Sequence, residues 1–250
     1  MILELDLGNT RSKWRLLSPA GATPVGIPGH AGVVETQSLR VGAVPAMWRE
    51  LPVTRVRAAN VAGSEAATGL CAIAEELGWG SVEFARVESQ CAGVTCGYRD
   101  VSRLGVDRWL AVIAAHQHFQ RPCLVADCGS AVTLDLLGAG GQHLGGYIVP
   151  GLGLMRRALF RDTDAVKVPD TLEAGMSLDA GCDTTAAVNR GLVLMVLGAI
   201  DEAMGRLAVK APAPLLVLTG GDGALLASLT RHRAELRPDL VLDGLALSNP

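Results

Sequence analysis

The sequence lacks the features that bind nucleic acid or cross a membrane. Its 22 basic and 25 acidic residues are mixed along 250 residues, for a net charge of −3, with no basic run and no ladder of basic and aromatic residues. Nucleic acid is therefore not an expected partner. The stretch 136–155 has no Asp, Glu, Lys or Arg, but its seven glycines and Pro150 are wrong for a membrane helix.

Signals for export, disulfides and metal binding are also missing. Glu4 and Asp6 interrupt the N-terminal apolar run and no basic segment precedes it, so no signal peptide is expected and a cytoplasmic location is the default. The six cysteines show no Cys-x-x-Cys spacing and are interpreted as reduced core residues. The five histidines, including His143 in a polar stretch, do not indicate a zinc site.

The usual phosphate-binding signatures are absent as well. There is no Walker A sequence, Gly-x4-Gly-Lys-Ser/Thr, and no protein-kinase signature. If the chain binds a nucleotide, another motif must hold the phosphates.

What the sequence does contain is one motif that occurs twice. An apolar stretch runs into Asp-x-Gly-Asn-Thr at 6–10, and a second runs into Asp-x-Gly-Ser-Ala at 127–131. A strand-like segment follows each, at 14–17 and 132–137. The two copies lie about half a chain apart, which predicts two duplicated halves, each opening with a β-hairpin that presents an Asp and a Gly turn.

These turns have the chemistry of a phosphate clamp. An Asp at the end of a buried strand can hold a cation or a metal-bound water, and the Gly lets the backbone aim N–H groups at an anion. Two such turns facing each other would clamp a nucleoside triphosphate. Lys13 begins the second strand and could reach a phosphate, although it could also be a solvated surface lysine.

Periodicity predicts the remaining organisation. Strands are expected at 53–61, 82–87, 144–148 and 215–218, helices at 64–77, 106–119, 184–207 and from residue 224, a basic helix start at Arg156 and a loop at 19–32. The order β-β-β-α-β-α, repeated, indicates two α/β lobes with mixed sheets rather than a Rossmann chain. A mean hydropathy of +0.32 indicates extensive burial, consistent with a subunit interface.

Two further segments are candidates for function. Asp107 and Arg108 fall in the first turn of the helix at 106–119, where free N–H groups and the helix dipole favour an anion. They could instead be an ordinary N-terminal helix charge and its exposed neighbour. The loop 219–223, Thr-Gly-Gly-Asp-Gly, could pack on a nucleotide or be a plain strand-to-helix turn. With the phosphate turns, a carboxylate and a cation suit a kinase that acts on an acidic alcohol.

Seven motifs in order closely resemble the type III pantothenate kinases, also called Bvg accessory factors, over the whole chain. They are Asp6-x-Gly8-Asn9-Thr10-x-x-Lys13, Tyr98, Gly105-Val106-Asp107-Arg108, Asp127-x-Gly129-Ser130-Ala131, Gly145-Gly146-Tyr147-Ile148-x-Pro150-Gly151, Thr184-x-x-Ala187-Val188-x-x-Gly191 and Thr219-Gly220-Gly221-Asp222. The resemblance implies an actin-like, ribonuclease H-related fold and ATP-dependent phosphorylation of pantothenate, the first step of coenzyme A synthesis.

The resemblance also implies roles for particular residues. The segment 6–13 would cradle the ATP phosphates and help to place Mg²⁺, Asp107 would be the base on the acceptor hydroxyl, and Asp127 would bind K⁺ or ammonium. The ATP-binding residues would be Asp6, Leu7, Gly8, Asn9, Thr10, Arg11, Ser12, Lys13 and Ser130. The pantothenate pocket would comprise Tyr98, Gly105, Val106, Asp107, Arg108 and Thr184.

The expected organisation is an N-terminal lobe at 1–118, with the phosphate hairpin and a linking helix, and a C-terminal lobe at 119–250, with the cation site and an adenosine-side loop. A homodimer is also implied, and Ser130 replaces the family's usual Thr. Two alternatives are an actin-like enzyme acting on water or another small alcohol and a non-enzymatic regulatory protein. The intact charged residues Asp6, Lys13, Asp107 and Asp127 argue against the regulatory protein.

Overall fold

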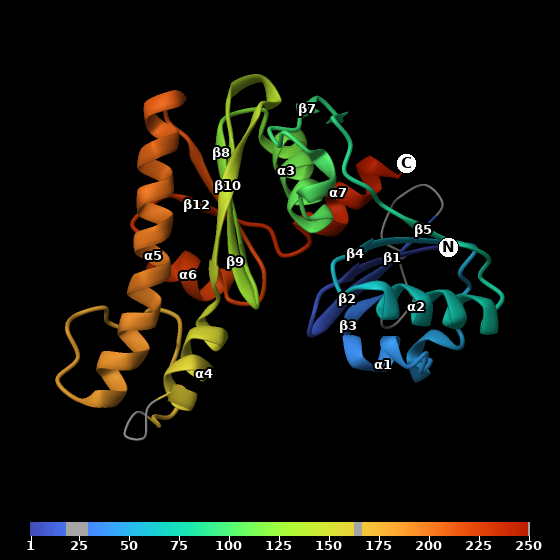
Figure 1. Ribbon diagram of the computed structural model, residues 1–250, viewed down its shortest axis with the longest axis horizontal. Helices are drawn as coiled ribbons and strands as arrows, with labels where there is room; N and C mark the ends of the chain where they lie inside the picture. Colours follow the sequence, from blue (N-terminus) through green and yellow to red (C-terminus); the bar gives the residue numbers. More distant parts are fainter. Residues whose placement is uncertain (19–29, 163–166, 250) are drawn as a thin grey trace. The chain divides into compact units, whose positions relative to one another are not determined.

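A computed structural model describes residues 1–18, 30–162 and 167–249, and these form two compact units (Figure 1). Unit 1 comprises Met1–Ala92, Asp100–Ala114 and Val241–Pro250, and unit 2 comprises Gly93–Arg99 and Ala115–Leu240. Residues of helix α3 (Val106–Phe119) therefore belong to both units. The C-terminal segment returns to the unit that holds the N-terminus.

Unit 1 is built on a five-stranded mixed sheet in the order β3-β2-β1-β4-β5. Strand β1 pairs antiparallel with β2 and parallel with β4. The elements are β1 (Ile2–Leu7), β2 (Arg11–Leu17), β3 (Ala31–Glu35), α1 (Thr36–Arg40), the 3-10 turn η1 (Ala46–Trp48), β4 (Arg55–Asn60), α2 (Ser64–Glu76), β5 (Val82–Phe84), η2 (Val101–Arg103) and α7 (Leu240–Ser248).

Alternation along β1 sends Leu3, Leu5 and Leu7 to one face of this sheet, where they are fully buried. Two tryptophan pairs complete this core: Trp48 lies against Trp14 and against Trp79, with ring centroids 6.0 Å apart in each pair. The core therefore occupies one face of the sheet and leaves the other for polar side chains.

Unit 2 repeats the same plan. Its five strands have the order β10-β9-β8-β11-β12, and β8 pairs antiparallel with β9 and parallel with β11. The elements are β8 (Cys123–Cys128), β9 (Ala131–Leu137), η3 (Ala139–Gly141), β10 (His143–Pro150), α4 (Leu152–Asp162), α5 (Thr184–Lys210), β11 (Leu215–Thr219), α6 (Gly223–Leu229) and β12 (Ala234–Leu236). A two-stranded ribbon of β6 (Gln90–Cys91) and β7 (Val94–Thr95) precedes α3.

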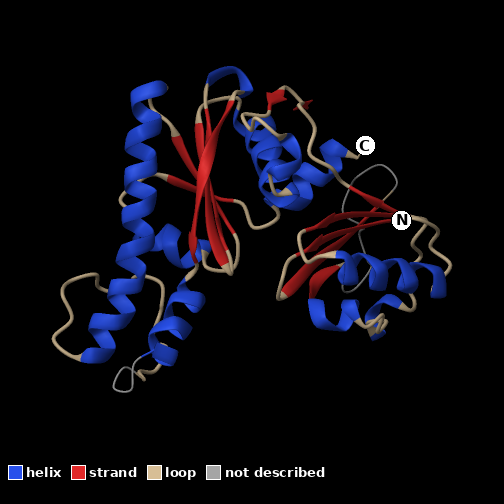
Figure 2. Ribbon diagram, viewed as in Figure 1, coloured by secondary structure: helices blue, strands red, loops and turns tan. Residues whose placement is uncertain are grey.

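Helix α5 covers one face of this second sheet (Figure 2). Asp183 caps it, because its carboxylate accepts a hydrogen bond from the Ala186 N–H at 2.8 Å. Its apolar side, including Leu192, Val196 and Ile200, packs on β8, β9 and β11. The largest core of unit 2 thus lies between α5 and the sheet.

The fold expected from the sequence is confirmed. Matching strand orders in the two units are the structural counterpart of the repeated Asp-x-Gly motif. Helix α2 ends as expected, because Gly78 follows it with φ of +69°, a conformation that glycine adopts readily. Helix α4 begins at Leu152 rather than at Arg156, and most of the expected loop 19–32 lies outside the described residues.

Two further expectations meet the structure here. All six cysteines are free, but only Cys123 and Cys128 are buried, whereas Cys71 and Cys182 are exposed, so the prediction of core cysteines is wrong for the latter two. Among the described residues, the helices include none with the length and apolar character needed to span a bilayer.

Candidate active site

The first candidate motif lies at the turn between β1 and β2. Asp6 and Lys13 are register partners on adjacent strands, and both side chains are half-buried. The Gly8 N–H donates to the Asp6 carbonyl at 3.2 Å. A Cβ at Gly8 would lie 2.8 Å from the Arg11 carbonyl oxygen, so the tight turn requires glycine.

Thr36, at the start of α1, holds this turn and was not identified from the sequence. Its buried hydroxyl donates to the Gly8 carbonyl at 2.7 Å and lies 2.8 Å from the Ser12 hydroxyl. Its backbone N–H donates to the Thr10 carbonyl at 3.0 Å. A single threonine outside any motif gives no sequence signal for this role.

The residues of the predicted ATP-binding segment 6–13 therefore differ in exposure. Leu7 and Ser12 are buried, with the leucine in the core and the serine against Thr36. Asn9, Thr10 and Arg11 are exposed at the tip. Only the tip and the Asp6–Lys13 pair offer side chains to a ligand, while the buried members shape the turn.

The second motif lies at the N-terminus of α3. Asp107 is in the first turn, and its Oδ1 accepts a hydrogen bond from the Arg108 N–H at 2.8 Å. A Cβ on Gly105 would lie 2.6 Å from that oxygen, so only glycine leaves the carboxylate in place. Arg108 is only 6% exposed, so the reading of it as an exposed neighbour is wrong.

In unit 2, three separate segments meet at the turn between β8 and β9. Gly220, with φ of +83°, approaches so closely that a Cβ there would lie 2.4 Å from Asp127 Oδ1. The Asp222 N–H donates to the Cys128 carbonyl at 2.9 Å, and the Gly151 N–H donates to the Ser130 carbonyl at 3.1 Å. The loop 219–223 connects β11 to α6 and packs on the second Asp-Gly motif.

This turn concentrates negative charge. Burial, together with the neighbouring Asp127 and Asp222 carboxylates, raises the pKa of Cys128 well above its usual range. The groups at this turn include carboxylate and carbonyl oxygens, the donor type that K⁺ and Mg²⁺ require, and Asp127 supplies a negative charge. Among the described residues, no group of three or more His, Cys, Asp or Glu side chains is arranged to hold a metal ion, so any cation here would rely on backbone oxygens as well.

Tyr98 contacts a buried pair that the sequence did not reveal. Its ring stacks on His143, whose Nε2 lies 3.0 Å from Asp135 Oδ1. The Gly97 N–H donates to His143 Nδ1 at 3.4 Å, which places the imidazole proton on Nε2, facing Asp135. His143, expected in a loop or polar stretch, is instead the first residue of β10 and is fully buried.

Thr184 begins α5 beside a pocket of about 730 Å³. Its lining is mostly apolar and comes from α4, α5 and the residues just before α5. The lining residues are Leu159, Gly181, Cys182, Asp183, Thr184, Ala187, Val188, Gly191, Leu192 and Met195. Such a pocket suits a small organic ligand better than a phosphate.

The predicted site residues fall in both units. Asp6, Lys13, Asp107 and Arg108 belong to unit 1. Tyr98, Asp127, Ser130 and Thr184 belong to unit 2.

Two sheets of identical strand order, each opening with an Asp-Gly hairpin, define a protein of the actin-like ATPase fold. The chain belongs to the type III pantothenate kinase family, since the sequence profile of that family matches residues 2–206. A relative named type III pantothenate kinase from Pseudomonas paraeruginosa is 42% identical, over 100% of this chain and 99% of the relative. One of the same name from Chromohalobacter salexigens is 37% identical, over 100% of this chain and 88% of the relative.

Solved structures agree on the fold. A Campylobacter jejuni protein described as a Baf family transcriptional activator is similar with a TM-score of 0.62 and 22% identity, over 98% of this chain and 95% of its own. The ethanolamine utilization protein EutJ from Carboxydothermus hydrogenoformans gives a TM-score of 0.54 at 12% identity, over 99% and 89% of the two chains. At these identities the likeness concerns the fold alone.

Proposed function

We propose that this chain transfers the γ-phosphoryl group of ATP to the primary hydroxyl of pantothenate, the first step of coenzyme A synthesis. Membership of the kinase family supports the reaction class. The observation that carries the assignment at residue level is the N-terminal turn of α3, where Gly105 leaves room for the Asp107 carboxylate beside buried Arg108.

In this reaction Asp107 accepts the proton of the acceptor hydroxyl as its oxygen forms a bond to the γ-phosphorus. The bond from that phosphorus to the bridging oxygen breaks, and ADP leaves. Arg108 binds the pantothenate carboxylate, which a guanidinium suits through paired hydrogen bonds. The family resemblance also assigns Gly105, Val106, Tyr98 and Thr184 to pantothenate binding.

The hairpin residues bind the nucleotide. The tip at 9–11 and Lys13 contact the phosphates, with Asp6 on the same strand pair, and Ser130 contacts ATP from the other turn. Mg²⁺, when bound, neutralises charge on the transferred phosphoryl group. Asp127 holds the monovalent cation, K⁺ or ammonium, with backbone oxygens of its turn.

This assignment gives each lobe a role. The phosphate hairpin and the linking helix belong to the proposed N-terminal lobe, 1–118, and the cation site and the adenosine-side loop belong to the proposed C-terminal lobe, 119–250. The last residues of the chain, Val241–Pro250, pack with unit 1 instead of the second lobe. Six free cysteines suit a reducing, cytoplasmic setting.

We also propose a homodimer. Leu194 and Met195 on α5 are 60% and 63% exposed, and Leu159 on α4 is 37% exposed. Met195 and Leu159 also line the pocket at Thr184. Exposed large apolar side chains favour a protein partner, and a second copy of this chain is the one we propose.

One experiment separates the proposal from its alternatives. Purified protein is incubated with ATP, Mg²⁺ and K⁺, with and without pantothenate, and ADP release is followed. We expect release that depends on pantothenate. Equal release without pantothenate would indicate an ATPase, and no release in either case would favour the non-enzymatic regulatory protein.

A further inference from the structure

A cluster of buried charged side chains lies on β1, β2 and β4 of unit 1, centred on Glu4, two residues before Asp6 of the phosphate hairpin. Side chains two residues apart on a strand share a face, so Glu4 and Asp6 both point away from the leucine core. The register partners of Glu4 are Arg15 on β2 and Arg57 on β4, whereas Asp6 faces Lys13. The side chains of Glu4, Arg15 and Arg57 are thus the next neighbours, on the same face of the sheet, of Asp6 and Lys13, the predicted phosphate ligands.

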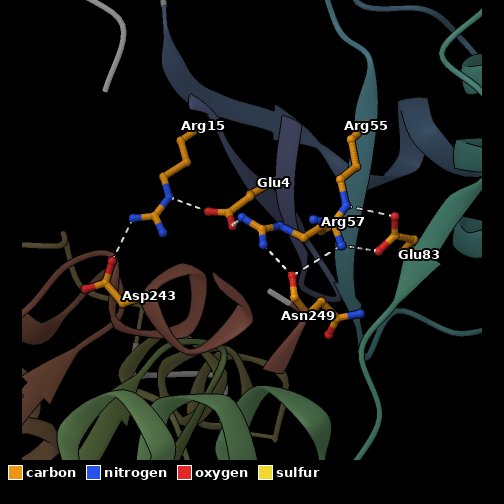
Figure 3. Close-up of polar contacts among 7 residues, drawn as sticks. All are labelled: Glu4, Arg15, Arg55, Arg57, Glu83, Asp243 and Asn249. Atoms are coloured by element: carbon orange, nitrogen blue, oxygen red, sulfur yellow. Dashed lines mark hydrogen bonds and ion pairs between the residues drawn. The ribbon is translucent and has the colours of Figure 1, made fainter. Parts of the chain in front are cut away.

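Glu4 is fully buried and binds both of its partners (Figure 3). Its Oε2 accepts from Arg15 Nε at 2.6 Å, and its Oε1 lies 2.7 Å from Arg57 Nη2. Burial disfavours the charged form of Arg15, but Glu4 and Asp243 outweigh it and raise the pKa of Arg15. The buried carboxylate is therefore compensated by two guanidinium groups.

The two arginines carry the cluster on to the C-terminal helix α7. Arg15 Nη1 donates to Asp243 Oδ1 at 2.7 Å, across 228 residues of sequence, and Arg57 donates to the Asn249 carbonyl (Figure 3). Asp243 lies in the first turn of α7, and Asn249 directly follows its last turn. A carboxylate at the start and a cation at the end both suit the helix dipole, so the sheet holds α7 at both ends.

The middle of α7 packs closely against α3, the helix that carries Asp107. A Cβ on Gly244 would lie 2.0 Å from the Leu110 carbonyl oxygen, so the two backbones are as close as glycine allows. Leu110 lies one helical turn after Asp107 on α3. Asp243, the residue next to this crossing, is the one that Arg15 holds to the sheet.

We infer that Asp243 is a positioning residue for the kinase reaction, acting with Arg15 and Glu4 to hold the first turn of α3 through α7. The inference rests on the proposed role of Asp107 as the base. Loosening the ion pair would let α7 and the first turn of α3 move, so the carboxylate would meet the hydroxyl less often. Substrate affinity depends on other contacts and would change little, whereas kcat would fall.

The test compares Asp243→Asn with the wild-type protein. We expect kcat to fall about three- to thirtyfold, with KM for ATP and for pantothenate within about twofold of wild type. Asp243→Glu, which keeps the charge, should recover most of kcat. Hydrogen–deuterium exchange without substrates should show faster exchange at 106–110 in Asp243→Asn.

Asp201→Asn is the matched control. Asp201 lies on α5, pairs with Arg231 at 3.1 Å, and has a side chain 28% exposed, against 30% for Asp243. We expect its kcat and its exchange at 106–110 to equal those of wild type. The inference is overturned if Asp243→Asn leaves either kcat or the exchange unchanged, or if Asp243→Glu fails to recover kcat. If the wild-type protein releases no ADP, the proposed kinase function is refuted. Hydrogen–deuterium exchange needs no turnover, so it still tests whether Asp243 holds the first turn of α3.

Discussion

The Tyr98 ring lies parallel to the His143 imidazole, with ring centroids 6.0 Å apart and an interplanar angle of 9°. His143 is in turn fixed by Asp135 Oδ1 at 3.0 Å and by the Gly97 N–H at 3.4 Å. The orientation of a predicted pantothenate contact therefore depends on a buried pair outside every motif of the sequence.

We expect His143→Gln to raise KM for pantothenate about two- to tenfold, the cost of losing one ring stack, while KM for ATP stays constant. Glutamine can still donate to Asp135 but offers no ring. The control is His232→Ala, which breaks the His232–Asp201 pair on another part of unit 2 and should leave both KM values unchanged. An equal rise in both KM values would contradict a specific role at Tyr98.

Asp107→Asn should lower kcat about 10²- to 10⁴-fold, because the amide cannot accept the proton of the hydroxyl. The substitution keeps the side-chain volume next to Gly105, so the first turn of α3 should persist. Turnover is measured by coupled ADP release and ATP affinity by calorimetry. Turnover close to wild type would remove Asp107 from its role as base.

Replacing K⁺ with Na⁺ should lower the rate about ten- to a hundredfold, if a fixed cation stabilises charge at the reacting phosphate. Asp127→Asn should give the same low rate in either salt, because the carboxylate that selects the cation is gone. The rates are compared at equal ionic strength. A wild-type enzyme indifferent to the cation would contradict the assignment of Asp127.

Thiol reactivity should follow burial. Burial raises the pKa of Cys123 to about 12, so its thiol stays protonated and unreactive at pH 8, and the same holds for Cys128. Exposed Cys71 should react with iodoacetamide within minutes, as read by peptide mass spectrometry. In urea all three should react, and rapid modification of Cys123 in the folded protein would contradict its burial.

Leu194→Glu should convert the proposed homodimer to a monomer, because a charge in place of this exposed apolar side chain of α5 cannot be buried against a second copy. Val209→Glu is the control on the same helix, about 22 Å along its axis and 88% exposed. Light scattering after gel filtration gives the mass of each. A wild-type monomer at micromolar concentration would refute the dimer.

Local patterns were enough to predict much of the fold. Alternation in 53–61 predicted β4, and the glycine after 64–77 predicted the end of α2. The strand and the helix end depend on residues that are neighbours in the sequence, so composition and periodicity are enough to predict them. The same holds for the Asp-Gly hairpins, whose turn chemistry is encoded in five consecutive residues.

Contacts between distant segments could not be predicted in this way. The contacts of Thr36 with the Gly8 carbonyl, of Asp135 with His143 and of Asp243 with Arg15 join residues 28, 8 and 228 positions apart, and Thr36, Asp135 and Asp243 lie outside every recognised motif. Arg108 was considered as an exposed neighbour because a charged residue usually is one, and only packing shows it buried.

The sequence by itself determined that two related halves each open with an acidic turn, because strand alternation and turn residues are properties of short segments. Only the tertiary structure decided which side chains support those turns and that the last helix returns to the first sheet. Both outcomes depend on contacts made in the folded interior. The buried Glu4 carboxylate is compensated by Arg15 and Arg57 from two other strands, and no pattern of neighbouring residues predicts that these three side chains come together.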